Sequence, residues 1–415
     1  MRIVVAVHGT RGDVEPCAAV ARELRSRGHD VKMAVPPNLI GFVESVGLGP
    51  AEAYGVDSAK QVESEAFQNY WKVKNPVAAI RDGIAYYTDG WADMNSALTE
   101  LAADADIILT GTTYQEVAAN VAERFGIPMA ALHYFPARPN RHLLPVPLPT
   151  WAIKTGFAVG EWALWRLGKS AEDEQRRTLG LPATNIRSAR RVVEAGALEI
   201  QAYDPAFFPG LAEEWGDGRP LVGGITLALE TTIDEEVTSW IEAGTPPIYF
   251  GFGSMPVQSP ADAVAMITEV CAELGERALI SAGVWELGDL PQAEHVKLVG
   301  ALNHSAVFPA CRAVVHHGGA GTTAAGARAG VPTLVLWVSA DQPLWARAVR
   351  KLKIGTSQRF TSMSKKSLTA ALRTVLDPVV AQRARDFAAG LATPAQSVSS
   401  AADLIEHAAQ TLRAG

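Results

Sequence analysis

An apolar strand that runs directly into a glycine-rich turn and then a helix constrains this chain most. The apolar run Ala313–His316 is followed by the glycine-rich run 317–321, and residues 322–329 have helical character. The first N–H groups of a helix lack partners within it, and the helix dipole favours negative charge there. Glycine also lets an anion approach the backbone closely. The segment therefore predicts a phosphate site, with an ordinary turn that needs glycine only for its geometry as the alternative.

Two other phosphate motifs are absent from the sequence. It contains no Gly-x-x-x-x-Gly-Lys-Ser/Thr, so a P-loop is excluded, and no Gly-x-Gly-x-x-Gly follows the first apolar run. The glycine-rich turn lies far along the chain, which implies that a second nucleotide-binding type of domain follows a first domain.

Length and composition narrow the class of protein. A chain of 415 residues exceeds a typical single core, so two domains are expected. Its net charge of −7 argues against a nucleic-acid partner, which usually selects a basic face. The three cysteines are odd in number and far apart, which indicates a reducing compartment. No Cys/His cluster has the spacing of zinc ligands.

The N-terminus has the character of a strand. Met1–Val7 is a short apolar run that meets His8 and Gly9 at once, unlike a signal peptide. No apolar run is long enough to cross a membrane. We expect a cytoplasmic protein without an integral membrane segment. Peripheral contact with the inner face of the membrane, through an amphipathic acceptor, stays open, although no basic amphipathic anchor is evident.

Strands alternate with helices along both halves of the chain. The expected strands are Ile3–Val7, Val31–Val35, Ile107–Thr110, Met129–Leu132, Pro247–Phe252, Arg277–Ser281, Val296–Leu298, Ala313–His316 and Thr333–Trp337. The expected helices include Pro16–Arg27, Gln115–Phe125, Trp151–Leu167, Asp262–Leu274 and Lys365–Leu376. This alternation predicts an α/β protein with two Rossmann-like, doubly wound parallel sheets that face each other across a cleft.

Composition suggests the boundaries of the domains. Proline and glycine cluster around residues 205–224, where we place the linker. The predicted parts are an acceptor-binding domain over 1–205, a linker over 206–232, a donor-binding domain over 233–390 and a final helix over 391–415. That helix could pack back on the first domain.

The first half contains a proline-rich loop followed by an aromatic helix. Residues 134–149 carry five prolines, which prevent regular secondary structure. Aromatic side chains near this loop provide a plausible wall for a bulky apolar acceptor, although core packing explains any single one of them as well. The candidate acceptor contacts are Trp71, His133, Phe135 and Trp151.

Polar residues follow three strands of the second half. Ser254, the run His317–Thr323 and the pair Asp341-Gln342 each come where a predicted strand ends. Ligands of doubly wound sheets bind at the carboxyl ends of the strands. We therefore expect these groups to lie in one site.

Four of these motifs, taken in order, resemble a known family. They are Gly9–Pro16, Phe250–Met255, His316–Thr323 and Asp341–Pro343. The chain resembles inverting GT-B glycosyltransferases of the UDP-glycosyltransferase superfamily (glycosyltransferase family 1) over nearly its whole length. The N-terminal motif is most similar to the actinobacterial glycopeptidolipid, glycopeptide-antibiotic and sterol branches.

The resemblance implies roles for the donor-site residues. The phosphates of a UDP- or dTDP-sugar would be held by Ser254, His317, Gly319, Ala320, Gly321 and Thr322. Asp341 and Gln342 would contact the sugar. The base and ribose would lie along Val284, Trp285, Leu302 and Asn303, where the stacking tryptophan of plant relatives is missing.

The N-terminal motif implies the catalytic base. Asp13 stands where plant-type relatives carry a catalytic histidine, and a carboxylate there can take a proton from an acceptor hydroxyl. The simpler alternative is that Asp13 only caps a helix. His8 could assist. Thr10, Arg11 and Gly12 would form a loop that contacts phosphate or acceptor.

The implied reaction is transfer of a hexose or deoxyhexose, with inversion, to a hydroxyl of a lipophilic or peptidic acceptor. A helix N-terminus would replace the metal ion, so we expect neither metal nor cofactor. A sterol or lipid glucosyltransferase, a nucleotide-sugar epimerase of similar fold and a non-catalytic nucleotide-sugar binding module remain alternatives. The sequence leaves the nucleotide, the sugar, the acceptor and the oligomeric state open.

Overall fold

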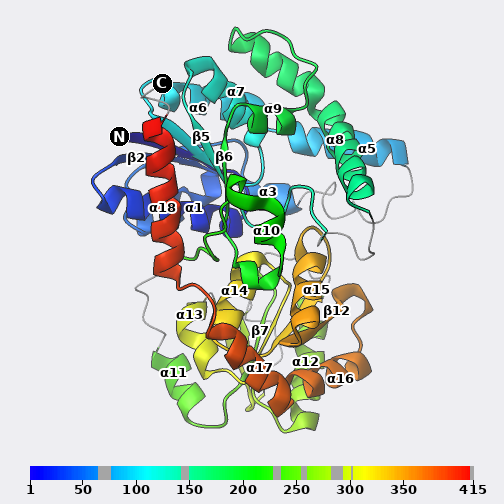
Figure 1. The fold of residues 1–415 in the computed structure, drawn as a ribbon. Helices are drawn as coiled ribbons and strands as arrows, with labels where there is room; N and C mark the ends of the chain where they lie inside the picture. Colours follow the sequence, from blue (N-terminus) through cyan, green and yellow to red (C-terminus); the bar gives the residue numbers. More distant parts are fainter. Residues whose placement is uncertain are drawn as a thin grey trace. The chain divides into compact units, whose positions relative to one another are not determined.

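The computed structural model describes residues 1–63, 76–141, 149–227, 235–253, 259–281, 293–300 and 302–411. It divides into two compact units, each described here by itself (Figure 1). The first unit comprises Met1–Tyr203, Gly210–Leu227 and Pro394–Gly415, and the second comprises Asp204–Pro209 and Ala228–Thr393.

A six-stranded parallel sheet forms the centre of the first unit. Its order is β3-β2-β1-β4-β5-β6, with β1 Arg2–Ala6, β2 Asp30–Val35, β3 Ala51–Ala53, β4 Ile107–Thr110, β5 Met129–His133 and β6 Leu198–Gln201. Central β1 pairs with both neighbours, Ile3 opposite Val31 and Ile107, and its residues 3–6 are almost fully buried. An all-parallel sheet needs such apolar strands because helices cover both of its faces.

The helices of the first unit supply the remaining core. They are α1 Arg11–Ser26, α2 Ile40–Ser45, α3 Ser58–Glu63, α5 Pro76–Thr88, α6 Trp91–Ala102, α7 Gln115–Phe125, α8 Thr150–Thr178, α9 Ser188–Glu194, α10 Leu211–Trp215 and α18 Pro394–Thr411. Met94 and Leu98 of α6 and Val117 of α7 pack with Val4 and Ile108 of the sheet.

The second unit has the same architecture. Its parallel sheet has the order β12-β11-β10-β7-β8-β9, with β7 Ile248–Gly251, β8 Ala278–Ser281, β9 Val296–Val299, β10 Ala313–His316, β11 Thr333–Trp337 and β12 Gly355–Arg359. The helices are α11 Glu235–Glu242, α12 Pro260–Leu274, α13 His304–Val307, α14 Ala320–Arg328, α15 Gln342–Leu352, α16 Lys365–Val375 and α17 Pro378–Ala388. The predicted class, α/β with two doubly wound parallel sheets, is confirmed.

Two helices differ from the sequence prediction. Helix α1 begins at Arg11 rather than Pro16, because Thr10 takes an extended N-cap conformation and Asp13 accepts a hydrogen bond from its N–H. Helix α8 continues to Thr178, well beyond the expected Leu167.

The sequence did not predict strand β6, because this strand contains a charged residue. Its Glu199 is only 2% exposed, and Arg138 and Arg219 pair with it at 2.6 and 2.8 Å. A buried carboxylate is tolerated when cations compensate it, so the strand lacks the apolar pattern that reveals its neighbours.

The chain passes between the units differently from the predicted 206–232 linker. Residues 210–227 group with the first unit, because Gln201 of β6 exchanges backbone hydrogen bonds with Pro220 and Val222. Asp204–Pro209 groups with the second unit, where Phe207 packs edge-to-face on Trp345.

The C-terminal helix α18 packs on α1 within the first unit. The guanidinium of Arg27 donates hydrogen bonds to Asp403, Glu406 and Ser399, and Glu406 also bonds His29. Among the described residues, no helix is both long and apolar enough to cross a membrane.

The pH dependence of stability provides a test of the buried polar cluster around His133. The ring is fully enclosed, with Gln115 and Gln201 on its two nitrogens, and burial lowers its pKa from 6.5 to about 4. Below pH 6.5, His133 takes up a proton in the unfolded chain but stays neutral in the folded chain until the pH approaches 4. The free energy of unfolding therefore falls as the pH decreases toward 4. We expect the first unit to lose about 2 kcal/mol from this group between pH 7 and pH 5.

Urea unfolding at both pH values measures this loss. The variant His133→Gln, which cannot titrate, should show a correspondingly smaller decrease between the two pH values. Equal decreases in the variant and the wild type would contradict the assignment.

Candidate active site

The glycine-rich turn after β10 takes the shape that the sequence predicts. Gly318 has φ +95°, and a Cβ at this position would lie 2.7 Å from Val335 Cγ1, so only glycine fits. Gly319 is the N-cap of α14 and provides no side chain to cap the helix. The first N–H groups of α14, from Ala320 to Thr322, therefore point out of the helix at partly exposed positions.

The ring of His317 occupies the space that two glycines leave. A Cβ on Gly253 would lie 2.8 Å from His317 Cε1, and a Cβ on Gly319 would lie 2.7 Å from its Nε2. Gly253 follows β7, so the imidazole lies between the end of this strand and the start of α14. Larger residues on either side would displace the ring.

Both histidines of the turn are neutral at physiological pH. Burial lowers the pKa of His317 to about 4, more than the nearby Gly251 carbonyl raises it, and this carbonyl lies outside hydrogen-bonding geometry for the buried Nδ1. Burial also lowers the pKa of His316 well below its ordinary value, and His316 Nδ1 accepts a hydrogen bond from the N–H of Gly318. His317 can thus offer a neutral N–H donor but no positive charge.

The next strand end carries an acidic residue. Asp341 is the N-cap residue of α15, and its Oδ2 accepts a hydrogen bond from the indole N–H of Trp345 at 3.0 Å. Burial raises the pKa of Asp341, which the bond from Trp345 partly offsets. The side chain of Gln342 closes the loop, because its Oε1 accepts from the N–H groups of Val338 and Ser339.

These strand ends meet in the second unit. β10 lies between β7 and β11 in the sheet. A Cβ on Gly318 would approach the backbone of Gln342 to 3.5 Å, so the turn after β10 touches the first residue of α15. The structure therefore brings together the predicted phosphate loop and the predicted sugar-binding pair.

The residues expected to hold base and ribose, and Ser254, which was expected at the phosphates, divide into two groups. Ser254, Val284 and Trp285 lie outside the described residues. Leu302 packs beside the core cluster of the second unit, and Asn303 caps α13 by accepting from the N–H of Ser305. Both follow β9 at the edge of the sheet.

Asp13 lies in the first turn of α1, after β1 of the first unit. Its Oδ2 accepts hydrogen bonds from the N–H and the hydroxyl of Thr10 at 2.8 and 3.2 Å. The phenol of Tyr134 donates to the backbone carbonyl of Asp13 at 2.7 Å. A Cβ on Gly9 would collide with the Asp13 carboxylate at 2.3 Å. The helix cap that was the simpler alternative for Asp13 is thus present, and the side chain remains partly exposed.

The neighbours of Asp13 differ in exposure. His8 is 1% exposed, its Nε2 bonds the Val56 carbonyl at 3.0 Å, and burial lowers its pKa. Arg11 and Gly12 are exposed, and the Arg11 guanidinium lies over the ring of Phe42.

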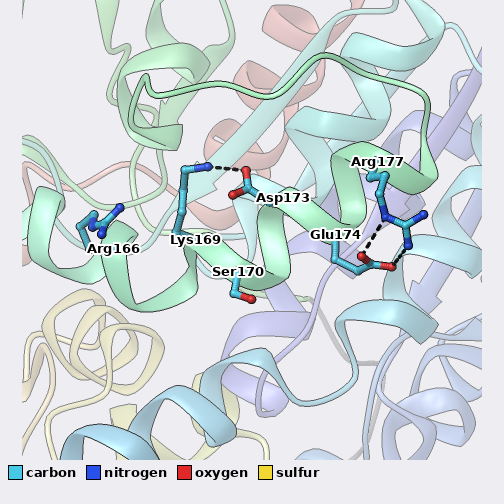
Figure 2. A pocket seen from close by; sticks show the side chains of 6 residues that line it. All are labelled: Arg166, Lys169, Ser170, Asp173, Glu174 and Arg177. Atoms are coloured by element: carbon cyan, nitrogen blue, oxygen red, sulfur yellow. Dashed lines mark hydrogen bonds and ion pairs between the residues drawn. The ribbon is translucent and has the colours of Figure 1, made fainter.

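The predicted acceptor contacts do not share one surface. His133 is buried in its polar cluster, Phe135 is half-buried and Trp151 is 72% exposed at the start of α8. Trp71 lies outside the described residues. A pocket on the second half of α8 is lined by Arg166, Ser170 and the ion pairs Lys169–Asp173 and Arg177–Glu174 (Figure 2). Its charges mostly neutralise one another, so we assign it no ligand.

Sequence reasoning missed two residues that hold the site in place. Tyr134 anchors the backbone of Asp13, and Trp345 anchors the carboxylate of Asp341. The spacing of Asp341 and Trp345, one helical turn apart, was the available signal, whereas nothing local links Tyr134 to Asp13. Among the residues that the structure describes, no group of three His, Cys, Asp or Glu side chains could hold a metal ion.

Comparison with known proteins supports one family over both units. Residues 3–141 match the glycosyltransferase family 28 N-terminal domain, and residues 261–408 match the C-terminal domain of erythromycin biosynthesis protein CIII-like proteins. An uncharacterized glycosyltransferase of Mycobacterium tuberculosis is 55% identical over 415 residues, with 100% of both chains covered. A sterol 3-beta-glucosyltransferase of Arabidopsis thaliana is 30% identical over 94% of this chain and 65% of its own.

Solved structures share the fold. The calicheamicin glycosyltransferase CalG4 has a TM-score of 0.73 at 18% identity, with 98% of each chain covered. The glycosyltransferase VinC, in complex with dTDP, has a TM-score of 0.67 at 18% identity and covers 99% of this chain and 100% of its own. The paired parallel sheets, the two matching domain models and the full-length relatives show that this chain belongs to the GT-B glycosyltransferases of glycosyltransferase family 1.

Proposed function

We propose that this enzyme transfers a hexose or deoxyhexose from a UDP- or dTDP-sugar to a hydroxyl of a bulky lipophilic or peptidic acceptor. The observation that carries the proposal is the meeting of the uncapped N-terminus of α14 with His317 and the Asp341-Gln342 loop. An anion site beside a site for hydroxyl groups suits a sugar diphosphate. VinC and SsfS6, two structures of the same fold, were solved with dTDP or thymidine diphosphate.

In this proposal the diphosphate binds at the start of α14. The N–H groups of Gly319, Ala320 and Gly321 donate to phosphate oxygens, with Thr322 and Ser254 as further donors. His317 adds a neutral N–H, which its low pKa supports. As the sugar leaves, negative charge grows on the diphosphate, and donors that are already oriented stabilise it without reorganising.

Asp341 and Gln342 would bind hydroxyls of the donor sugar. The Asp341 carboxylate is half-buried and is oriented by the indole of Trp345. A carboxylate held in this way forms strong hydrogen bonds to hydroxyl donors. Leu302 and Asn303, with Val284 and Trp285, remain proposed contacts of the base and ribose.

We assign the base to Asp13. Its carboxylate, partly exposed in the first turn of α1, would take the proton of the acceptor hydroxyl as that oxygen attacks C1 of the sugar. Attack from the face opposite the leaving diphosphate inverts the configuration at C1.

We further propose that no metal ion is needed. The helix N-terminus and its neutral donors take the place of a divalent cation in this scheme. Transfer that requires an added divalent cation would contradict this part of the proposal.

A sterol or lipid glucosyltransferase is the second candidate, favoured by the 30% identity to plant sterol 3-beta-glucosyltransferases. A nucleotide-sugar epimerase would convert the donor without an acceptor. Assays with and without a sterol, a lipopeptide and a glycopeptide aglycone therefore separate the candidates.

The variant Asp13→Asn tests the base. Asparagine can still accept the hydrogen bond from Thr10, so the helix start is preserved, while the proton acceptor is lost. We expect kcat to fall by about 10²–10⁴-fold in a mass-spectrometric transfer assay with EDTA present. Undiminished transfer by Asp13→Asn would move the base to His8 or Asp341.

The variants Asp341→Ala and Trp345→Phe test the sugar contacts. Loss of a hydrogen bond to a charged group should lower kcat/KM for the donor roughly 10–100-fold in Asp341→Ala. We expect a smaller decrease in Trp345→Phe, which keeps the carboxylate and an aromatic ring but loses the orienting N–H and part of the buried ring volume. Binding of the free nucleoside diphosphate, which carries no sugar, should stay unchanged in calorimetry. Equal weakening of diphosphate and sugar-nucleotide binding would argue against a sugar contact.

A further inference from the structure

The outward face of the first half of α8 is unusually apolar for a solvent-exposed helix. Among the described residues, eight large apolar side chains are exposed, and five of them lie on this helix. They are Trp151, Val159, Trp162, Leu164 and Leu167, with exposed fractions of 37–72%. At 3.6 residues per turn, Trp151, Val159 and Trp162 share one face of the helix with Arg166, and these residues define the outward face, whereas Leu164 lies on the opposite side. A sixth, Ile186, adjoins Arg187, which donates to the Ala158 carbonyl of α8. Apolar exposure concentrated in this way marks a contact surface.

The charges on this face have one sign. Lys154 and Arg166 are exposed, whereas Glu161, the single carboxylate within residues 151–167, is half-buried and pairs with Arg187. The chain as a whole carries a net charge of −7. A cationic, tryptophan-bearing strip on an acidic protein complements an anionic, apolar partner.

The second half of α8 lacks this character. Lys169, Asp173, Glu174 and Arg177 carry charges of both signs and form two ion pairs, Lys169–Asp173 and Arg177–Glu174 (Figure 2). The apolar and cationic strip therefore ends near Leu167, about 25 Å from the start of the helix at 1.5 Å per residue. This length is ample for a helix that lies in the plane of a bilayer surface.

We propose that the outward face of residues 151–167 binds the surface of an anionic lipid bilayer. Tryptophan rings prefer the boundary between headgroups and acyl chains, where the ring is apolar and the indole N–H stays wet. Lys154 and Arg166 then contact lipid phosphates. The face carries the features of an interfacial helix, which the sequence concealed because its tryptophans are equally typical of a core. This inference does not depend on the identity of the acceptor.

Vesicle sedimentation with the full-length protein tests the proposal. The wild type should bind vesicles of phosphatidylglycerol and phosphatidylcholine, less at high salt, and should bind pure phosphatidylcholine weakly. The double variant Val159→Gln/Trp162→Gln should lose roughly tenfold or more in partitioning, because two apolar side chains no longer enter the interface. Lys154→Gln/Arg166→Gln should lose binding to the anionic vesicles selectively.

Val379→Gln is the matched control, since Val379 is 55% exposed on α17 and lies outside this face. Its binding should equal that of the wild type, and circular dichroism should show all variants folded. Equal sedimentation of the wild type and the Val159→Gln/Trp162→Gln variant would overturn the proposal, as would absence of binding to anionic vesicles. A wild-type dimer in light scattering that this variant abolishes would also overturn it, because the face would then bind a second copy.

Discussion

The packing of one imidazole between two glycines underlies the arrangement of the proposed donor site. His317 fills the space beside Gly253 and Gly319. In the same turn, Gly318 lies so close to Val335 of β11 and Gln342 of α15 that a larger residue would not fit. Because these residues follow neighbouring strands of a parallel sheet, the sheet order itself delivers them to the same edge. Burial lowers the pKa of both histidines of the turn, so both are neutral at neutral pH. In the proposed diphosphate site, an anion would therefore be recognised by oriented N–H groups and the helix dipole rather than by ion pairs.

Much of the fold was predictable from local pattern. The strands with continuous apolar runs, such as Ile107–Thr110 and Ala313–His316, occur where the sequence places them, because burial on both faces demands that composition. Strand β12, with the polar sequence GTSQR, is half-exposed and gave no such signal. The start of α1 at Arg11 depended on the reciprocal placement of Thr10 and Asp13, a spacing that the proline at 16 obscured. Edge strands and helix starts are set by few interactions, so composition reveals them poorly.

The candidate site was predictable to the extent that it is local. The turn at 317–321 and the pair Asp341-Gln342 can be recognised from the sequence alone, and the order of the strands in the sheet brings them together. Contacts between residues far apart in the chain, such as the hydrogen bond from Tyr134 to the carbonyl of Asp13, produce no recognisable pattern in the sequence. Exposure is equally hidden from sequence: His133 and Trp151 look alike as aromatic neighbours of a proline-rich loop, yet one is buried and the other stands in solvent.

The segment Asp204–Pro209, where the chain enters the second unit, has a consequence for donor recognition. Phe207 and Phe208 both lie 5.3 Å from the ring of Trp345, whose indole holds Asp341. Trp345 thus takes part both in the packing of the segment Asp204–Pro209 and in the orientation of the Asp341 carboxylate. Equilibria that share a structural element are coupled reciprocally. If Asp341 binds the donor sugar, as we propose, the free energy of that binding is linked to the order of the segment Asp204–Pro209 through Trp345.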